Sequence, residues 1–197
     1  EMIAEGTTDD PARLAERILD TGEDLVAMAD KERKLVELLT EDPDQQRIDL
    51  GYALEELAER SRAAHPLNEI TVECPPDAVV AAVPQLTDAL AELIENAALH
   101  ADHDDPRVAV TVTREDGTVR IAVRDNGPGI PETERRILSG DDEITPLRHG
   151  SGLGLRLVGQ VVKQSGGSLY FADNDPTGSV VELVFPTDET EGDGTTT

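Results

Sequence analysis

Two β-hairpin signals separated by helices constrain the fold of this chain more than any other feature. Residues 107–113 and 118–124 alternate apolar and polar side chains on either side of Glu115-Asp116-Gly117, which is typical of a tight hairpin. Residues 168–172 and 179–185 form a second such pair. Because helical segments interrupt these strands, the sequence predicts an α+β fold in which helices cover one face of a mixed, mostly antiparallel sheet.

Apolar spacing predicts the remaining elements of the folded part. A strand is expected from Asn68 to Cys74, where every second residue is apolar. Helices are expected around Tyr52 to Ala58, from Pro84 to Ala97, and from Leu153 to Gln164. The globular domain is therefore predicted to extend over residues 46–187, followed by a disordered polar tail over 188–197.

Residues 10–40 carry a helical pattern of a different kind. Their apolar side chains follow alternating steps of three and four, with the polar Thr21 and Glu32 at two of the positions. This spacing favours a coiled-coil or bundle helix within a separate helical region, residues 1–45. The alternative is an amphipathic helix that lies on the following domain. The residues that define this heptad seam are Leu14, Ile18, Leu25, Met28, Leu35 and Leu39.

The composition excludes several classes of protein. The chain has 197 residues with 42 acidic and 17 basic side chains, a net charge of −25 that disfavours nucleic acid and anionic membranes as partners. Its acidic, lysine-poor surface is similar to that of proteins from salt-accumulating halophiles, although an acidic mesophilic protein would have the same composition. The single Cys74 excludes an intrachain disulfide. With no long apolar run and no signal-peptide pattern, we expect a cytoplasmic protein.

Glu92 and Asn96 are the first candidates for a functional site. They lie four residues apart and share one face of a predicted helix, where asparagine is locally unfavourable. A carboxylate and a carboxamide placed together are oxygen ligands suited to Mg²⁺. Taken alone, the pair is equally compatible with a solvated polar face.

Two glycine-rich segments follow along the chain. Asp125-Asn-Gly-Pro-Gly-Ile130 comes after a strand, so the carboxylate of Asp125 is placed to accept a hydrogen bond from an exocyclic amine such as that of adenine. Gly150-Ser-Gly-Leu-Gly-Leu155 precedes a helix and would present backbone N–H groups to phosphate. Each segment alone is also explained as a turn or an ordinary helix start.

The three motifs in this order resemble the N, G1 and G2 boxes of the GHKL, or Bergerat-fold, ATPases, which include gyrase, heat-shock protein 90, histidine kinases and MutL. The resemblance covers residues 50–186, and the heptad seam upstream is similar to the second helix of a histidine kinase dimerisation domain. It implies the ATP-binding catalytic part of a sensor histidine kinase, which transfers the ATP γ-phosphate to a histidine for relay to a response-regulator aspartate. Its partners would be a second protomer, bound through the bundle helix, and a receiver domain.

The resemblance also assigns roles to individual residues. Asn96 would be the Mg²⁺ ligand, Asp125 would recognise the adenine amine, and Glu92 would orient or deprotonate the attacking imidazole. Leu99 stands where many kinases place a phosphate-contacting Lys or Arg, and Arg148 is the candidate replacement. The further positions expected to contact the nucleotide are His100, Gly127, Gly129, Ile130, Gly150, Ser151, Gly152, Leu153, Gly154, Leu155 and Ser179.

Three alternatives to a histidine kinase follow from the same motifs. A degenerate nucleotide-binding scaffold is favoured by Leu99, and an anti-sigma-type serine kinase is disfavoured by the long seam helix. A gyrase- or MutL-like ATPase is disfavoured because few residues follow the last strand. No histidine in this sequence has the context of a phosphoacceptor, so we expect the acceptor to lie upstream of Glu1.

Overall fold

A computed structural model of the chain describes residues 11–41, 43–101, 104–130 and 151–187. The elements follow in the order α1 (Pro11–Thr40), β1 (Gln46–Asp49), α2 (Leu50–Ala64), β2 (Glu69–Glu73), β3 (Val79–Ala82), α3 (Leu86–His100), β4 (Arg107–Glu115), β5 (Thr118–Asp125), α5 (Ser151–Gln164), β6 (Ser168–Asp173) and β7 (Ser179–Pro186).

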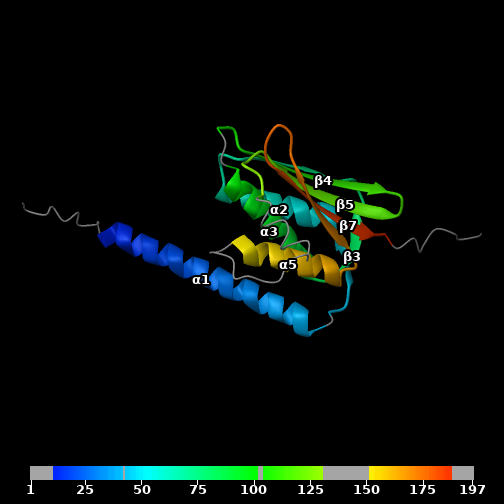
Figure 1. The fold of residues 1–197 in the computed structure, drawn as a ribbon, viewed down its shortest axis with the longest axis horizontal. Coiled ribbons are helices and arrows are strands. Elements are labelled where there is room, and N and C mark those ends of the chain that lie inside the picture. Colours follow the sequence, from blue (N-terminus) through cyan, green and yellow to red (C-terminus); the bar gives the residue numbers. More distant parts are fainter. Residues whose placement is uncertain (1–10, 42, 102–103, 131–150, 188–197) are drawn as a thin grey trace, which may run out of the picture.

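Five strands form the main sheet, in the order β2-β4-β5-β7-β6. All neighbours are antiparallel except the β2–β4 pair, so the predicted mixed, mostly antiparallel sheet is confirmed (Figure 1). The β4–β5 turn has positive φ at Asp116 and Gly117 (47° and 73°), as a two-residue hairpin with the twist of its strands requires. Both predicted hairpins are therefore present.

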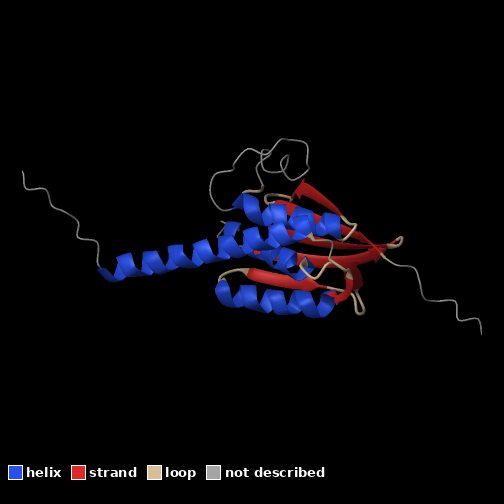
Figure 2. Ribbon diagram, turned by 90° about the horizontal axis from the view of Figure 1, so that it is seen from below, coloured by secondary structure: helices blue, strands red, loops and turns tan. Residues whose placement is uncertain are grey.

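One face of the sheet is buried beneath the helices. Val110, Ile121 and Leu183 are at most 1% exposed and come from three adjacent strands. They pack into one core with apolar side chains of α2, α3 and α5, so the helices form a layer against the sheet (Figure 2). On the opposite face the strands carry partly exposed charges, such as the ion pair between Arg120 and Glu182 at 3.1 Å.

A second, two-stranded sheet was not predicted from the sequence. β1 and β3 pair antiparallel, with Ile48 opposite Val80, and both of these side chains are buried. Asp49 ends β1 and caps α2, where its side chain accepts a hydrogen bond from the backbone N–H of Tyr52 at 3.1 Å. Tyr52, at the start of the helix predicted here, is 75% exposed because it lies on the side of α2 opposite the buried Leu50 and Leu54.

The long helix α1 is both anchored on the domain and largely exposed. Its C-terminal part lies along α5, and its N-terminal part projects away from the sheet and the other helices (Figure 1). Leu35 and Leu38 are buried, whereas Leu14, Ile18 and Leu25 of the heptad seam are 47–65% exposed. The stripe of α1 that faces the domain therefore differs from the heptad seam, and the two share Leu35. The expected packing of α1 on the domain is present, and pairing of the seam with another helix stays a prediction.

Candidate nucleotide-binding site

A cavity of about 290 Å³ opens between α3, the end of β5 and the start of β7. Its polar side chains come from α3 and from the ends of β5 and β7, and most of its other lining residues are apolar, as in most ligand sites. Seven of the residues proposed from the sequence line it, namely Asn96, His100, Asp125, Gly129, Ile130, Leu155 and Ser179. Segments that are far apart in the sequence thus meet at one site.

Asp125 is the most firmly held polar residue of this cavity. It ends β5, is 9% exposed, and its Oδ1 accepts backbone N–H groups from Gly127 at 2.9 Å and Ser179 at 3.3 Å. Its Oδ2 accepts the hydroxyl hydrogen bond of Ser179. A carboxylate has about four acceptor positions, so these three bonds leave one for a donor that enters the cavity.

Asn174 supports Asp125 from the β6–β7 loop and was not among the predicted site residues. Its side-chain amide donates to the backbone carbonyl of Asp125 at 2.7 Å. Gly178, in the same loop, has φ of 113°, and any side chain there would overlap that carbonyl. The loop before β7 therefore closes on the end of β5, and only glycine fits at position 178 without displacing Asp125.

Gly127 serves packing within the protein. A side chain at this position would overlap the backbone carbonyl of His100, which lies directly against it. The sequence argument assigned the space at Gly127 to the ligand, but the structure fills it with the end of α3. Gly129 and Ile130, by contrast, do line the cavity.

Glu92 lies on the other side of Asn96, outside the 290 Å³ cavity. Its Oε1 accepts the amide N–H of Asn96 at 3.2 Å, so the amide oxygen of Asn96 is turned away from the carboxylate. Glu92 lines a larger cavity of about 440 Å³ that it shares with α1 and α2. Both of its oxygens also contact Nζ of Lys31, at 2.9 and 2.7 Å.

Gly154 connects Glu92 to the glycine-rich start of α5. A side chain at Gly154 would overlap the carboxylate of Glu92, so the first turns of α5 pack directly on that side chain. Leu155, the next residue, is buried and reaches the smaller cavity. The third proposed motif is thus in contact with the first one.

Other proposed residues are placed less completely. Gly150 and Arg148 lie outside the described residues, while Ser151 and Gly152 form the first turn of α5. Leu153 follows them and is half-buried. Leu99 is 63% exposed on α3, and it offers no positive charge.

Within the described ranges, no group of three or more His, Cys, Asp or Glu side chains is arranged to hold a metal ion. The amide nitrogen of Asn96 is bonded to Glu92, whose two oxygens contact Lys31, so the amide oxygen of Asn96 is the donor of this pair that fits a cation. One such oxygen fits Mg²⁺, which normally keeps several waters and takes further ligands from substrate phosphates. A dedicated protein cage is not required for such an ion.

Two further properties of the chain lie apart from these cavities. Burial and the neighbouring charge of Asp49 raise the pKa of the Cys74 thiol. Among the helices that the structure describes, none combines the length and apolarity needed to span a bilayer.

Comparison with known proteins agrees with this arrangement. Residues 81–189 match the family described as histidine kinase-, DNA gyrase B-, and HSP90-like ATPase. The sensor histidine kinase component HK1 of Mycobacterium tuberculosis is 32% identical over 125 residues, which are 60% of this chain and 71% of HK1. The signal transduction histidine-protein kinase/phosphatase MprB of Mycobacterium sp. strain KMS is 39% identical over 98 residues, which are 48% of this chain but 19% of MprB.

Solved structures show the same relationship. The ATP-binding domain of PrrB from Mycobacterium tuberculosis is similar with a TM-score of 0.60 and 26% identity, covering 73% of this chain and 98% of that one. Mycobacterial MprB has a TM-score of 0.59 and 28% identity, covering 72% and 97%. The chain therefore belongs to the histidine kinase-, DNA gyrase B- and HSP90-like ATPases, and within them it corresponds to the ATP-binding catalytic part of a sensor histidine kinase.

Proposed function

We propose that this chain binds Mg²⁺-ATP in the 290 Å³ cavity and transfers the γ-phosphate to a histidine located upstream of it. The observation that carries this proposal is Asp125, a buried carboxylate that is fixed by three hydrogen bonds and keeps one acceptor position toward an apolar cavity. An adenine ring offers the matching donor, its exocyclic amine. Guanine presents a carbonyl oxygen at that position, which a carboxylate repels.

Asn96 and Glu92 belong to the reacting end of the same site in this proposal. Asn96 would hold Mg²⁺ through its amide oxygen, and the ion would neutralise charge on the phosphates. Glu92 would orient the N–H of the attacking imidazole. Neutral imidazole is nucleophilic near its pKa of about 6.5, so Glu92 acts mainly by alignment and only weakly as a base.

The phosphorylated histidine would pass its phosphoryl group to the aspartate of a response-regulator receiver domain, and the exposed seam of α1 would pair with a second protomer. Leu14, Ile18 and Leu25 support the pairing, since they leave an apolar stripe outside the domain contact. The degenerate-scaffold alternative is opposed by the presence of Glu92, Asn96 and Asp125 together. The serine-kinase alternative is opposed by the length of α1, 30 residues.

Nucleotide titrations test the binding assignment. Asp125→Asn preserves the shape of the side chain but faces adenine with an amide, so we expect ATP affinity to fall by about 10- to 100-fold, the effect of one charge-assisted hydrogen bond. The preference for ATP over GTP should narrow in the same variant. Asp116→Asn, in the β4–β5 turn, is the matched control and should bind ATP as the wild type does. Equal ATP binding by Asp125→Asn and Asp116→Asn would contradict the proposal.

Phosphotransfer is tested on the complete kinase with γ-labelled ATP. Acid-labile, alkali-stable label on the protein is expected for phosphohistidine, whereas acid-stable label would favour the serine kinase. ATP binding without label in any salt condition would favour the scaffold.

A further inference from the structure

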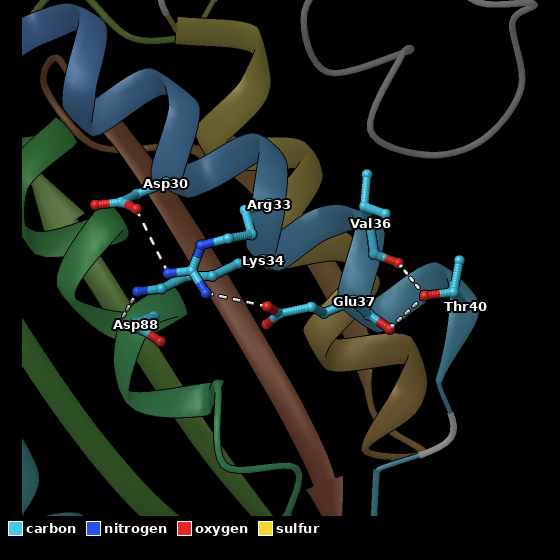
Figure 3. Close-up of polar contacts among 7 residues, drawn as sticks. All are labelled: Asp30, Arg33, Lys34, Val36, Glu37, Thr40 and Asp88. Carbon is cyan, nitrogen blue, oxygen red and sulfur yellow. Dashed lines mark hydrogen bonds and ion pairs between the residues drawn. The ribbon is translucent and has the colours of Figure 1, made fainter.

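Two lysines of α1 face two carboxylates of α3. Lys31 contacts Glu92 at 2.7 and 2.9 Å, and Lys34 contacts Asp88 at 2.6 Å. The lysines are three residues apart and the acids four apart, so each pair lies on the facing sides of two neighbouring helices. Figure 3 shows Lys34 extending from α1 toward Asp88. We refer to these two ion pairs as the lysine latch.

The contacts that hold the end of α1 are of another kind. Leu38 is fully buried in the domain core, and the side-chain amide of Gln164 donates to its backbone carbonyl at 2.7 Å. The latch lies one to two turns nearer the N-terminus. Its Lys34–Asp88 pair is open to water, with 30% and 44% of the side chains exposed, whereas its Lys31–Glu92 pair is more enclosed, with 32% and 10% exposed. The latch can therefore open while the apolar anchor of α1 stays in place.

The latch acts on a residue of the proposed reaction. Both oxygens of Glu92 contact Lys31, and one of them also accepts the amide of Asn96. An imidazole N–H that approached Glu92 would have to displace the ammonium group or share its oxygens with it. While α1 is latched, Glu92 is neutralised and occupied, and Gly154 holds it against α5.

We propose that the lysine latch is an inhibitory contact that withholds Glu92 from phosphotransfer and that opens when ionic strength rises. This inference rests on the proposed function for the role of Glu92. Charges that are partly open to solvent are screened over about 10 Å at 0.1 M salt and about 3 Å at 1 M. The Lys34–Asp88 pair is therefore the part of the latch that salt weakens most, and the more enclosed Lys31–Glu92 pair is screened less. The apolar anchor at Leu38 is not weakened by salt.

Selective lysine labelling tests the latch on this chain without nucleotide. The sequence contains only Lys31, Lys34 and Lys163, and Lys163 is exposed on α5, so it serves as an internal reference. Labelling with an amine-reactive ester, followed by mass spectrometry, should modify Lys31 and Lys34 at least about threefold more slowly than Lys163 at low salt. At 1 M KCl the protection of Lys34 should disappear, and that of Lys31 should decrease. Equal rates at low salt, or protection that salt does not change, would overturn the proposal.

Substitutions test whether each carboxylate protects its lysine from labelling. In Asp88→Asn the labelling rate of Lys34 should rise, and that of Lys163 should not change. Arg33 provides the control on α1, because its guanidinium pairs with Asp30 and Glu37 of the same helix (Figure 3). Arg33→Met should leave the labelling of both latch lysines as it is in the wild type. Protection of Lys34 that persists in Asp88→Asn would refute the assignment.

The regulatory part is tested on the complete kinase, with its phosphoacceptor histidine. Lys31→Met removes the ammonium group that occupies Glu92, so it should raise phosphotransfer at low salt by about threefold and reduce its stimulation by salt, while Arg33→Met should do neither. Combining Lys34→Asp with Asp88→Lys should keep the wild-type response. Phosphotransfer in Lys31→Met that equals the wild type at every salt concentration would overturn the inhibitory role. Failure of the wild type to bind ATP would refute the proposed function, and the labelling result would still decide whether the latch exists.

Discussion

The surroundings of Asp125 and those of Glu92 lie on either side of Asn96, yet they are held in different ways. Asp125 is held by Gly127, Ser179 and Asn174, which lie at the start of β7 and in the loops beside β5 and β7. Glu92 takes its only charged partner, within the described residues, from α1. In the proposed function, recognition of the base would therefore be built into the sheet, whereas the reacting end would depend on where a neighbouring helix lies.

The largest effect should come from removing the anchor of that helix. Leu38→Ala deletes a fully buried side chain and should lower the free energy of unfolding by about 2–5 kcal/mol. Because the loss falls on α1, the affinity for ATP of the folded protein should change little. Chemical denaturation and nucleotide titration measure the two quantities separately.

Leu39→Ala is the matched control for this variant. Leu39 is the next residue and is 60% exposed, so Leu39→Ala should change the free energy of unfolding by no more than about 0.5 kcal/mol. If Leu38→Ala lost ATP affinity as strongly as it lost stability, the two regions would not be independent.

Ser179→Ala tests the rigidity of the Asp125 region. Removing a hydroxyl that donates to a buried carboxylate should cost about 1.5–3 kcal/mol of stability, and ATP binding should weaken because Asp125 is less firmly oriented. Ser168→Ala, at the exposed start of β6, should remain within about 0.5 kcal/mol of the wild type. Denaturation curves in which the two alanine variants coincide would show that the hydrogen bond to Asp125 contributes nothing.

Gly154→Ala tests the contact between the two regions through α5. The added methyl group overlaps Glu92, so we expect overpacking to cost about 1–3 kcal/mol. Gly159→Ala in the same helix meets no atom within 4 Å and should stabilise the protein by about 0.5–1 kcal/mol. The temperature of thermal unfolding should therefore fall in Gly154→Ala and rise in Gly159→Ala. A rise in both variants would contradict the packing of Glu92 on α5.

The residues around Asp125 were predicted from the sequence, but the partner of Glu92 was not, because sequence patterns report local structure better than packing. Asp125 and Ser179 could be proposed because hairpin strands and glycine-rich turns are local patterns, although the hydrogen bond between them joins residues 54 apart. The Lys31–Glu92 pair spans 61 residues and depends on how α1 packs, which no local pattern specifies.

Particular residues show where the pattern was insufficient. Counting heptad positions selected Leu39, which is exposed, and passed over Leu38, which is buried in the core. The pairing of β1 with β3 was missed because four residues are too few to show a clear alternation. The magnesium site and the halophilic character of the surface stay predictions, because each depends on ions or conditions that sequence and fold do not fix.

The smallest predicted effect concerns the salt dependence that separates the two regions. Lys34→Met removes a partly exposed ion pair, so at 0.1 M salt it should cost at most about 1 kcal/mol of stability. At 1 M KCl that cost should vanish, because the pair is already screened in the wild type. The cost of Ser179→Ala should be the same at both salt concentrations, since Asp125 is buried and its hydroxyl partner is uncharged. Urea denaturation of the wild type, Lys34→Met and Ser179→Ala at the two salt concentrations measures this difference.

If Lys34→Met were still less stable than the wild type at 1 M salt, Lys34 would stabilise α1 by packing its methylene groups. The electrostatic distinction between the two regions would then be wrong.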